Sequence, residues 1–213
     1  MNKLGSLIFG ILVAFAVAWF GVVAYSYNHL GHFEPVVDDS SGDINPPPLS
    51  GLAVAGQRVY AANGCVACHT QQVRPAAFST DVEKKLGPRP TVARDFMRER
   101  PAFLGSLRIG PDLTNAGLLK MADDKPIDAN WLHRHLFEPT TVTPWSNMPS
   151  YRYLYITRKI SGQPSNNAVQ GLVGPHSPKE GYEVVPTEDA KTLVAYLLSL
   201  KRNYPLPEAE PLQ

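Results

Sequence analysis

The chain has 213 residues, enough for one domain of ordinary size and an additional segment. Its 20 lysines and arginines nearly balance 19 aspartates and glutamates. The resulting formal net charge of +1 argues against nucleic acid as a partner, because such binders carry a basic excess. Hydrophobic residues make up 44% of the sequence, which excludes disorder throughout. The two cysteines are too few for a disulfide-dense scaffold, and 20 prolines with 16 glycines predict a body rich in loops.

Residues 4–28 form a run without acidic or basic side chains, beginning LGSLIFGILV. As a helix, this run exceeds the ~30 Å hydrocarbon thickness of a bilayer. A cleaved signal peptide is the rival interpretation, but its apolar region is shorter, about 7–15 residues. We therefore expect residues 1–33 to be a retained membrane anchor in contact with lipid. Lys3 is the only charge before the run and acidic residues follow it, so the positive-inside rule places the N-terminus in the cytoplasm and the body across the membrane.

Residues 34–50 show no apolar periodicity and contain three consecutive prolines at 46–48. This composition predicts an extended, semi-rigid linker between the membrane and a domain at residues 51–204. Residues 205–213 are expected to form a C-terminal tail.

Three helices are predicted within this domain. The first follows Ser50, which suits an N-cap, and the second covers residues 128–138 before Pro139. The third follows Thr187 and ends before Pro205. The expected apolar faces are Leu52, Ala55, Val59 and Ala62 in the first helix, and Leu193, Leu197 and Leu200 in the third. No stretch sustains the alternation of a strand, so the predicted fold class is mainly α, with long loops and a single N-terminal transmembrane helix.

The sequence Cys65-Val66-Ala67-Cys68-His69 is the attachment signature of c-type haem. Two thiols at this spacing form thioethers to one porphyrin, and the adjacent His69 is placed to bind its iron. A thioredoxin-like site would need a βαβ context, a zinc site would need four ligands, and a disulfide across two residues would be strained. We therefore expect one covalently bound haem c, held by Cys65 and Cys68, in the core of a cytochrome c-like domain.

Met148 is the predicted second iron ligand. It lies in the loop TPWSNMPSY after the second helix, where Pro149 keeps its backbone extended. The plainer interpretation is a methionine that fills a gap in the core. Ligation by histidine and methionine raises the reduction potential and closes the iron to small ligands, which favours electron transfer.

Further residues are candidates for contacts with the haem. The carbonyl of Pro111 is expected to accept a hydrogen bond from the ring of His69, and Leu113 is expected to pack on the porphyrin. Arg74 and Arg108 are equally well explained as partners of the haem propionates and as solvated surface charges. His135 shares an apolar helix face and is expected to be a buried, hydrogen-bonded histidine.

The order of GQRVYAANGCVACHTQQVRP, GPDL, WLHRHLFEP and SNMPSY resembles the monohaem subunit II of cbb3-type cytochrome c oxidases. The stretch after His69, Thr-Gln-Gln-Val-Arg-Pro, is more specific than the cysteine motif itself. The resemblance implies a haem domain on the periplasmic side of the bacterial inner membrane. It also implies His69 and Met148 as axial ligands, and a last helix that packs near Gly56. Residues 76–107 and 154–186 depart from the pattern.

The resemblance implies partners as well, namely a polytopic haem–copper catalytic subunit and possibly other cytochrome c subunits. Within this chain no autonomous catalytic centre is expected, because a haem–copper site needs several intramembrane histidines and the single span has none. We therefore expect transfer of single electrons to an oxygen-reducing partner in aerobic respiration. A stand-alone anchored electron carrier is the alternative, and a catalytic cytochrome with an open iron, such as a peroxidase, is a third.

Overall fold

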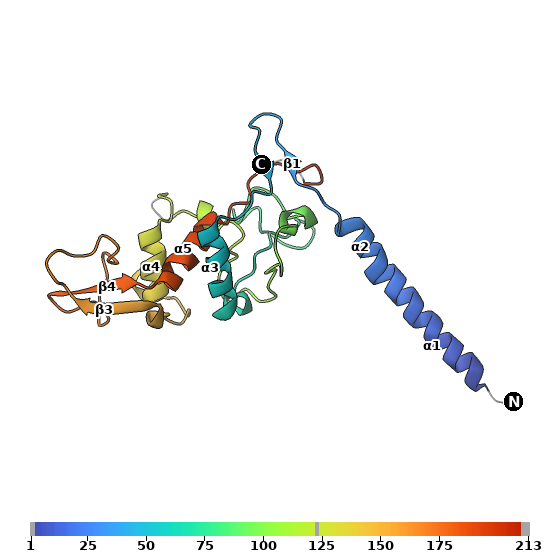
Figure 1. The fold of residues 1–213 in the computed structure, drawn as a ribbon, viewed down its shortest axis with the longest axis horizontal. Coiled ribbons are helices and arrows are strands. Elements are labelled where there is room, and N and C mark those ends of the chain that lie inside the picture. The colour runs from blue at the N-terminus through green and yellow to red at the C-terminus, as the bar shows by residue number, and fades with distance from the viewer. Residues whose placement is uncertain (1–2, 122–123, 210–213) are drawn as a thin grey trace.

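A computed structural model describes residues 3–121 and 124–209 (Figure 1). Met1 and the last four residues of the expected tail lie outside the described residues. The N-terminal helix runs without a break through α1 (Leu4–Ala18), the π-helical turn η1 (Trp19–Ala24) and α2 (Tyr25–Leu30). It spans 27 residues, and an 18-residue window within it has a mean hydropathy of 2.6 and contains no buried residue. In Figure 1 it projects from the body as a single rod, which is consistent with a membrane anchor.

The segment after this helix folds back on itself. Strands β1 (Val36–Val37) and β2 (Ile44–Asn45) pair antiparallel. The turn between them forms because the carboxylate of Asp38 accepts hydrogen bonds from the backbone N–H of Ser40, at 2.8 Å, and from its hydroxyl, at 2.6 Å. The prediction of an extended linker throughout 34–50 is therefore wrong for its first half.

Helices α3 (Gly51–Ala62) and α5 (Glu188–Ser199) cross in the core. A Cβ atom at Gly56 would overlap the Thr192 carbonyl and lie 2.8 Å from Cβ of Tyr196, so only glycine permits this approach. The predicted packing near Gly56 is confirmed, but the predicted apolar face of α3 is wrong. Its buried residues are Ala53, Gly56 and Tyr60, whereas Leu52 is 61% exposed. Small residues face α5 because they allow the two backbones to approach closely.

The other predicted helical features agree with the structure. Helix α4 (Ala129–Phe137) begins after Asp128, whose carboxylate accepts the Trp131 N–H at 2.7 Å. The side chains of Ser50 and Thr187 cap α3 and α5 in the same way, each at 3.3 Å. The predicted face of α5, namely Leu193, Leu197 and Leu200, is buried in the core with Leu132, Leu136 and Phe137 of α4.

A second antiparallel pair, β3 (Tyr155–Lys159) and β4 (Tyr182–Pro186), is absent from the sequence-based prediction. Short 3₁₀ turns complete the secondary structure: η2 (Cys65–Ala67), η3 (Ala93–Phe96), η4 (Ala116–Leu118), η5 (Pro139–Thr141) and η6 (Arg152–Leu154). Helices and helical turns hold 37% of the residues that the structure describes, so the mainly α fold class is only partly confirmed.

Residues 76–107 form a long, turn-rich segment that holds the C-terminal part of the chain. Arg89 and Asp95 form a buried ion pair at 2.9 Å, with side chains only 1% and 0% exposed. The same guanidinium donates to the Tyr204 carbonyl at 3.1 Å. Arg202 pairs with Glu99 nearby. These buried charge pairs hold the segment against the C-terminal part of the chain, while Phe103 joins the hydrophobic core.

Candidate haem site

The attachment motif follows directly on the end of α3. Gly64 turns the chain with a positive φ of 67°, and Cys65 begins the short turn η2. The His69 N–H then donates to the Cys65 carbonyl at 3.0 Å, which closes the motif into a compact loop. Both thiols are free, and burial raises the pKa of Cys65 to about 11, so this thiol is protonated at neutral pH.

The ring of His69 has the expected partner. Its Nδ1 lies 2.7 Å from the Pro111 carbonyl oxygen, which can only accept a hydrogen bond. Nδ1 is therefore the donor, and Nε2 keeps its lone pair. Gly110 packs on the ring so closely that a Cβ atom there would lie 2.8 Å from both ring nitrogens. The orientation of the imidazole is thus fixed from two sides.

The Met148 loop lies against the attachment motif. Met148 and Leu113 are partly buried and pack on the same apolar core as Cys65. The Tyr151 N–H donates to the Leu136 carbonyl at 2.8 Å, which anchors the loop to α4. Burial raises the pKa of Tyr151 to about 12, with a smaller contribution from the charge of Cys65. The loop and the motif therefore pack on the same apolar core.

A second contact ties the same two segments together. The hydroxyl of Tyr153 donates to the side-chain carbonyl of Asn63, one residue before the Gly64 turn. Asn63 in turn donates through its side-chain amide to the Val59 carbonyl at 2.7 Å. The end of α3, the motif and the methionine loop are therefore one connected unit.

The hydrogen bonding of His135 differs from the sequence-based prediction. Its ring stacks on Trp131 with centroids 4.9 Å apart and an interplanar angle of 8°. Burial, with a smaller contribution from the charge of His69, lowers the pKa of His135 to about 4. Its Nδ1 is buried and has no hydrogen-bond partner among the residues that the structure describes. The prediction of a fully hydrogen-bonded histidine is therefore wrong.

Arg108 has a role that the sequence did not reveal. Its guanidinium forms a bidentate ion pair with Asp81, at 2.6 and 2.7 Å, and Nε donates to the Thr70 hydroxyl at 2.7 Å. Burial alone would raise the pKa of Asp81, but hydrogen bonds from Arg108 and Ser79 hold that pKa below its usual range. These contacts engage the guanidinium of Arg108 with protein acceptors.

Sequence reasoning also missed Thr70, Asp81 and Asp112, all of which are buried. The signals for two of them were local, since Thr70 follows His69 and Asp112 follows Pro111. Asp81 has no such signal. Arg74, the other candidate for a propionate, gives its backbone N–H to Asp81 at 2.8 Å.

The residues around His69 suit a haem. The donor set is complete, with two free thiols, an imidazole whose Nε2 is available, and a thioether on the same core. Partly buried apolar side chains, including Val66, Leu113 and Tyr151, offer a wall for a flat apolar group. Nδ1 of His135 is buried without a hydrogen-bond partner in the described part of the chain, as expected where an added polar group would complete the pocket.

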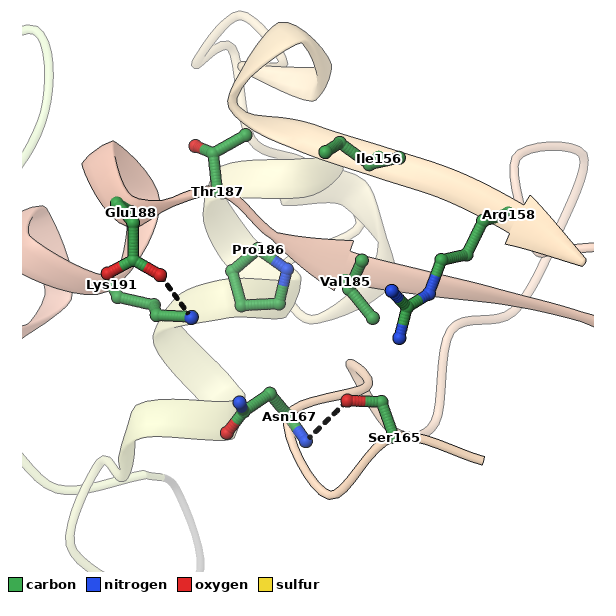
Figure 2. Close-up of a pocket in the computed structure, with 9 residues that line it drawn as sticks. All are labelled: Ile156, Arg158, Ser165, Asn167, Val185, Pro186, Thr187, Glu188 and Lys191. Atoms are coloured by element: carbon green, nitrogen blue, oxygen red, sulfur yellow. Dashed lines mark hydrogen bonds and ion pairs between the residues drawn. The ribbon is translucent and has the colours of Figure 1, made fainter. Parts of the chain in front are cut away.

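A separate cavity of about 410 Å³ lies between the β3–β4 pair, the start of α5 and the turn at Ser165–Asn167 (Figure 2). None of the predicted site residues lines it. Its two cationic side chains are already paired, Arg158 with Glu183 and Lys191 with Glu188. The cavity is therefore not part of the candidate haem site.

Comparison with known families agrees with the chemistry of the site. The family model described as "Cytochrome C oxidase, mono-heme subunit/FixO" matches residues 6–173, well over half of the chain and a range that includes every predicted site residue. None of the curated proteins matches the chain. The family supports a haem cofactor, a general role in electron transfer and association with an oxidase complex. The chain thus belongs to the family of monohaem subunits of cytochrome c oxidase, in agreement with its resemblance to subunit II of the cbb3 type.

Proposed function

We propose that this chain is a membrane-anchored c-type cytochrome that delivers single electrons to an oxygen-reducing haem–copper subunit. The observation that carries the proposal is the state of His69. Its Nδ1 is 2.7 Å from the Pro111 carbonyl, so Nε2 is left to bind iron, directly after two free thiols in the C-x-x-C-H spacing. This is the arrangement that a proximal haem ligand requires.

Each residue of the site then has a role. Cys65 and Cys68 would hold the porphyrin through thioethers, and His69 and Met148 would bind its iron. When bound, haem supplies reversible one-electron chemistry. Met148 would close the iron to small ligands, and Leu113 would help to exclude water from the ring. Exclusion of water and a methionine ligand both favour electron transfer over catalysis.

The anchor and the partner are part of the same proposal. The helix Leu4–Leu30 is long enough to cross a bilayer, and its apolar window contains no buried residue. Lys3 before it and the acids after it favour a cytoplasmic N-terminus and a periplasmic haem domain in the bacterial inner membrane. In that position the domain would meet a polytopic haem–copper subunit, and further cytochrome c subunits could supply its electrons.

The Met148→Ala variant tests the ligand assignment, with Met97→Ala as a matched control outside the methionine loop. Met148→Ala should keep its covalent haem, bind carbon monoxide when reduced and show a lower reduction potential, because the thioether is lost. Met97→Ala should behave as the wild type does. An unchanged spectrum and potential in Met148→Ala would contradict the assignment.

Covalent attachment and partnership need separate experiments. Haem should stay attached to the denatured wild-type chain. The amount of attached haem should fall, or be zero, in Cys65→Ala and Cys68→Ala, and a haem stain after gel electrophoresis measures it. Purification in mild detergent should recover a complex with a large polytopic subunit. A protein that purifies alone would instead support the stand-alone carrier, and a wild-type iron open to carbon monoxide would support a catalytic cytochrome.

A further inference from the structure

Behind His69 lies a set of polar side chains that the proposed function does not use. We name Thr70, Asp81, Arg108 and Asp112 the proximal network. Thr70 is 1% exposed, and Asp81 and Asp112 are each 2% exposed. Burying carboxylates is costly unless each is paired and hydrogen-bonded, so a cluster of this kind next to a ligand calls for a physical explanation.

Asp112 joins the two loops that carry the ligand and its acceptor. Its Oδ2 accepts the Thr70 hydroxyl at 2.5 Å and the Gln72 N–H at 2.9 Å, while Oδ1 accepts the Thr114 N–H at 2.9 Å. Thr70 follows His69 in the chain, and Asp112 follows Pro111. His69 and Pro111 are thus hydrogen-bonded to each other, and so are the residues that directly follow them, Thr70 and Asp112.

Arg108 fixes this junction to a third segment. It forms a bidentate pair with Asp81 and a hydrogen bond to Thr70. Its Nη2 also donates to the Gln72 carbonyl at 2.7 Å and lies 3.4 Å from Oδ2 of Asp112. A planar guanidinium engaged on several sides has little freedom to rotate. Asp81 is itself held by the Arg74 N–H. The network thus connects residues 70–74, 81 and 108–114 as one rigid unit.

Pro111 depends on such support. It has no N–H and cannot tether its own backbone by donating a hydrogen bond. The backbone bonds on either side are Gly110 N–H to the Cys68 carbonyl, at 3.0 Å, and Leu113 N–H to the Thr70 carbonyl, at 2.8 Å. Between these two points, the side chain of Asp112 is the group that ties the Pro111 turn to the motif.

We propose that the proximal network consists of positioning residues that hold the Pro111 carbonyl against Nδ1 of His69 and so set the orientation and donor strength of the axial imidazole. This inference rests on the proposed function, because it requires His69 to bind the iron. A hydrogen bond that the other ring N–H of a metal-bound imidazole donates to an acceptor raises the basicity of the ligand. Loosening the network therefore weakens the ligand without removing it, and destabilises the oxidised iron relative to the reduced iron.

The test uses the full chain, loaded with haem in cells that mature c-type cytochromes and purified in detergent. Thr70→Val removes the hydroxyl that bonds Asp112 and Arg108 without changing any charge. Thr157→Val, on the exposed side of β3, is the matched control. Nuclear magnetic resonance of the reduced protein measures exchange of the His69 Nδ1 proton with solvent, and a redox titration measures the potential.

Thr70→Val should retain covalent haem, exchange the Nδ1 proton at least about fivefold faster and show a raised potential, while Thr157→Val matches the wild type. If Thr70→Val does not fold, Arg108→Lys keeps the charge but loses the planar fork, and it should shift both measurements in the same direction. If haem-loaded Thr70→Val or Arg108→Lys shows the exchange rate and potential of the wild type, this inference is overturned while the proposed function still stands. A wild-type protein whose His69 is not bound to iron would overturn the proposed function with it.

Discussion

Replacing Gly110 with alanine probes how tightly the loop at 108–114 holds the ring of His69. A Cβ atom at this position would lie 2.8 Å from both ring nitrogens, well inside an ordinary contact. The φ angle of Gly110 is not in the left-handed region, so the backbone itself accepts alanine. Any effect of the substitution therefore comes from the contact with the ring.

Neither side of this contact can yield freely. The Gly110 N–H is bonded to the Cys68 carbonyl at 3.0 Å, and the ring is bonded to Pro111 at 2.7 Å. The ring carbon Cε1 would be closer still to the added Cβ, so restoring ordinary contacts requires the ring and the loop to separate by about 1 Å. Overpacking of this kind typically costs about 1–3 kcal/mol, and here the strain is placed on the predicted iron ligand.

The assay compares Gly110→Ala with Gly51→Ala, where an added Cβ would meet nothing within 4 Å. Denaturant unfolding should show a loss of about 1–3 kcal/mol for Gly110→Ala, together with an altered reduction potential. Gly51→Ala should be neutral or more stable by up to about 1 kcal/mol, since it lies in the first turn of α3. If the two variants are equal in stability and potential, the close packing of Gly110 on His69 is refuted.

Three further predictions follow from other parts of the structure. Arg89→Met leaves the buried carboxylate of Asp95 without its cation and should cost about 3–5 kcal/mol in denaturant unfolding; a loss below 1 kcal/mol would contradict the buried pair. Burial lowers the pKa of His133 from 6.5 to about 4, so the unfolded chain takes up this proton first and stability should fall as pH decreases from about 6.5 to 4. His133→Gln should make thermal unfolding less dependent on pH across that window, and an equal dependence would refute the assignment. Asp128→Ala removes the cap that accepts the Trp131 N–H and should cost about 1 kcal/mol, measured by thermal unfolding.

Features that a short stretch of sequence or the chemistry of a single residue decides could be predicted from the sequence. Ser50, Asp128 and Thr187 cap their helices as expected, because a cap is decided within three residues of the chain. The close approach of α5 at Gly56 was also predictable, since a missing side chain there removes a steric barrier. The contact between His69 and Pro111 belongs with these, because the carbonyl was chosen from the chemistry that the ligand requires.

Features that depend on pairing between distant segments could not be predicted. The strand Tyr155–Lys159 has one buried residue followed by four exposed ones, so it lacks the alternation that identifies a strand. Its partner, Tyr182–Pro186, lies more than 20 residues further along the chain. The buried face of α3 was missed for a related reason. Close packing against α5 decides this face, with Ala53 and Gly56 allowing the approach and Tyr60 lying against Tyr196, whereas the more hydrophobic Leu52 stays exposed.

The candidate site combines local features with contacts between distant segments. The cysteine motif is local, yet the bond from His69 to Pro111 spans 42 positions and the pair Arg108–Asp81 spans 27. Asp81 lies in the segment 76–107, which departs from the recognised pattern, and it pairs there with Arg108, a member of the proposed proximal network. The same segment carries Arg89 and Asp95, which bind the C-terminal part of the chain. A region without a motif of its own thus reaches the residues behind His69 through one carboxylate, Asp81, and the C-terminal part of the chain through the pair Arg89–Asp95.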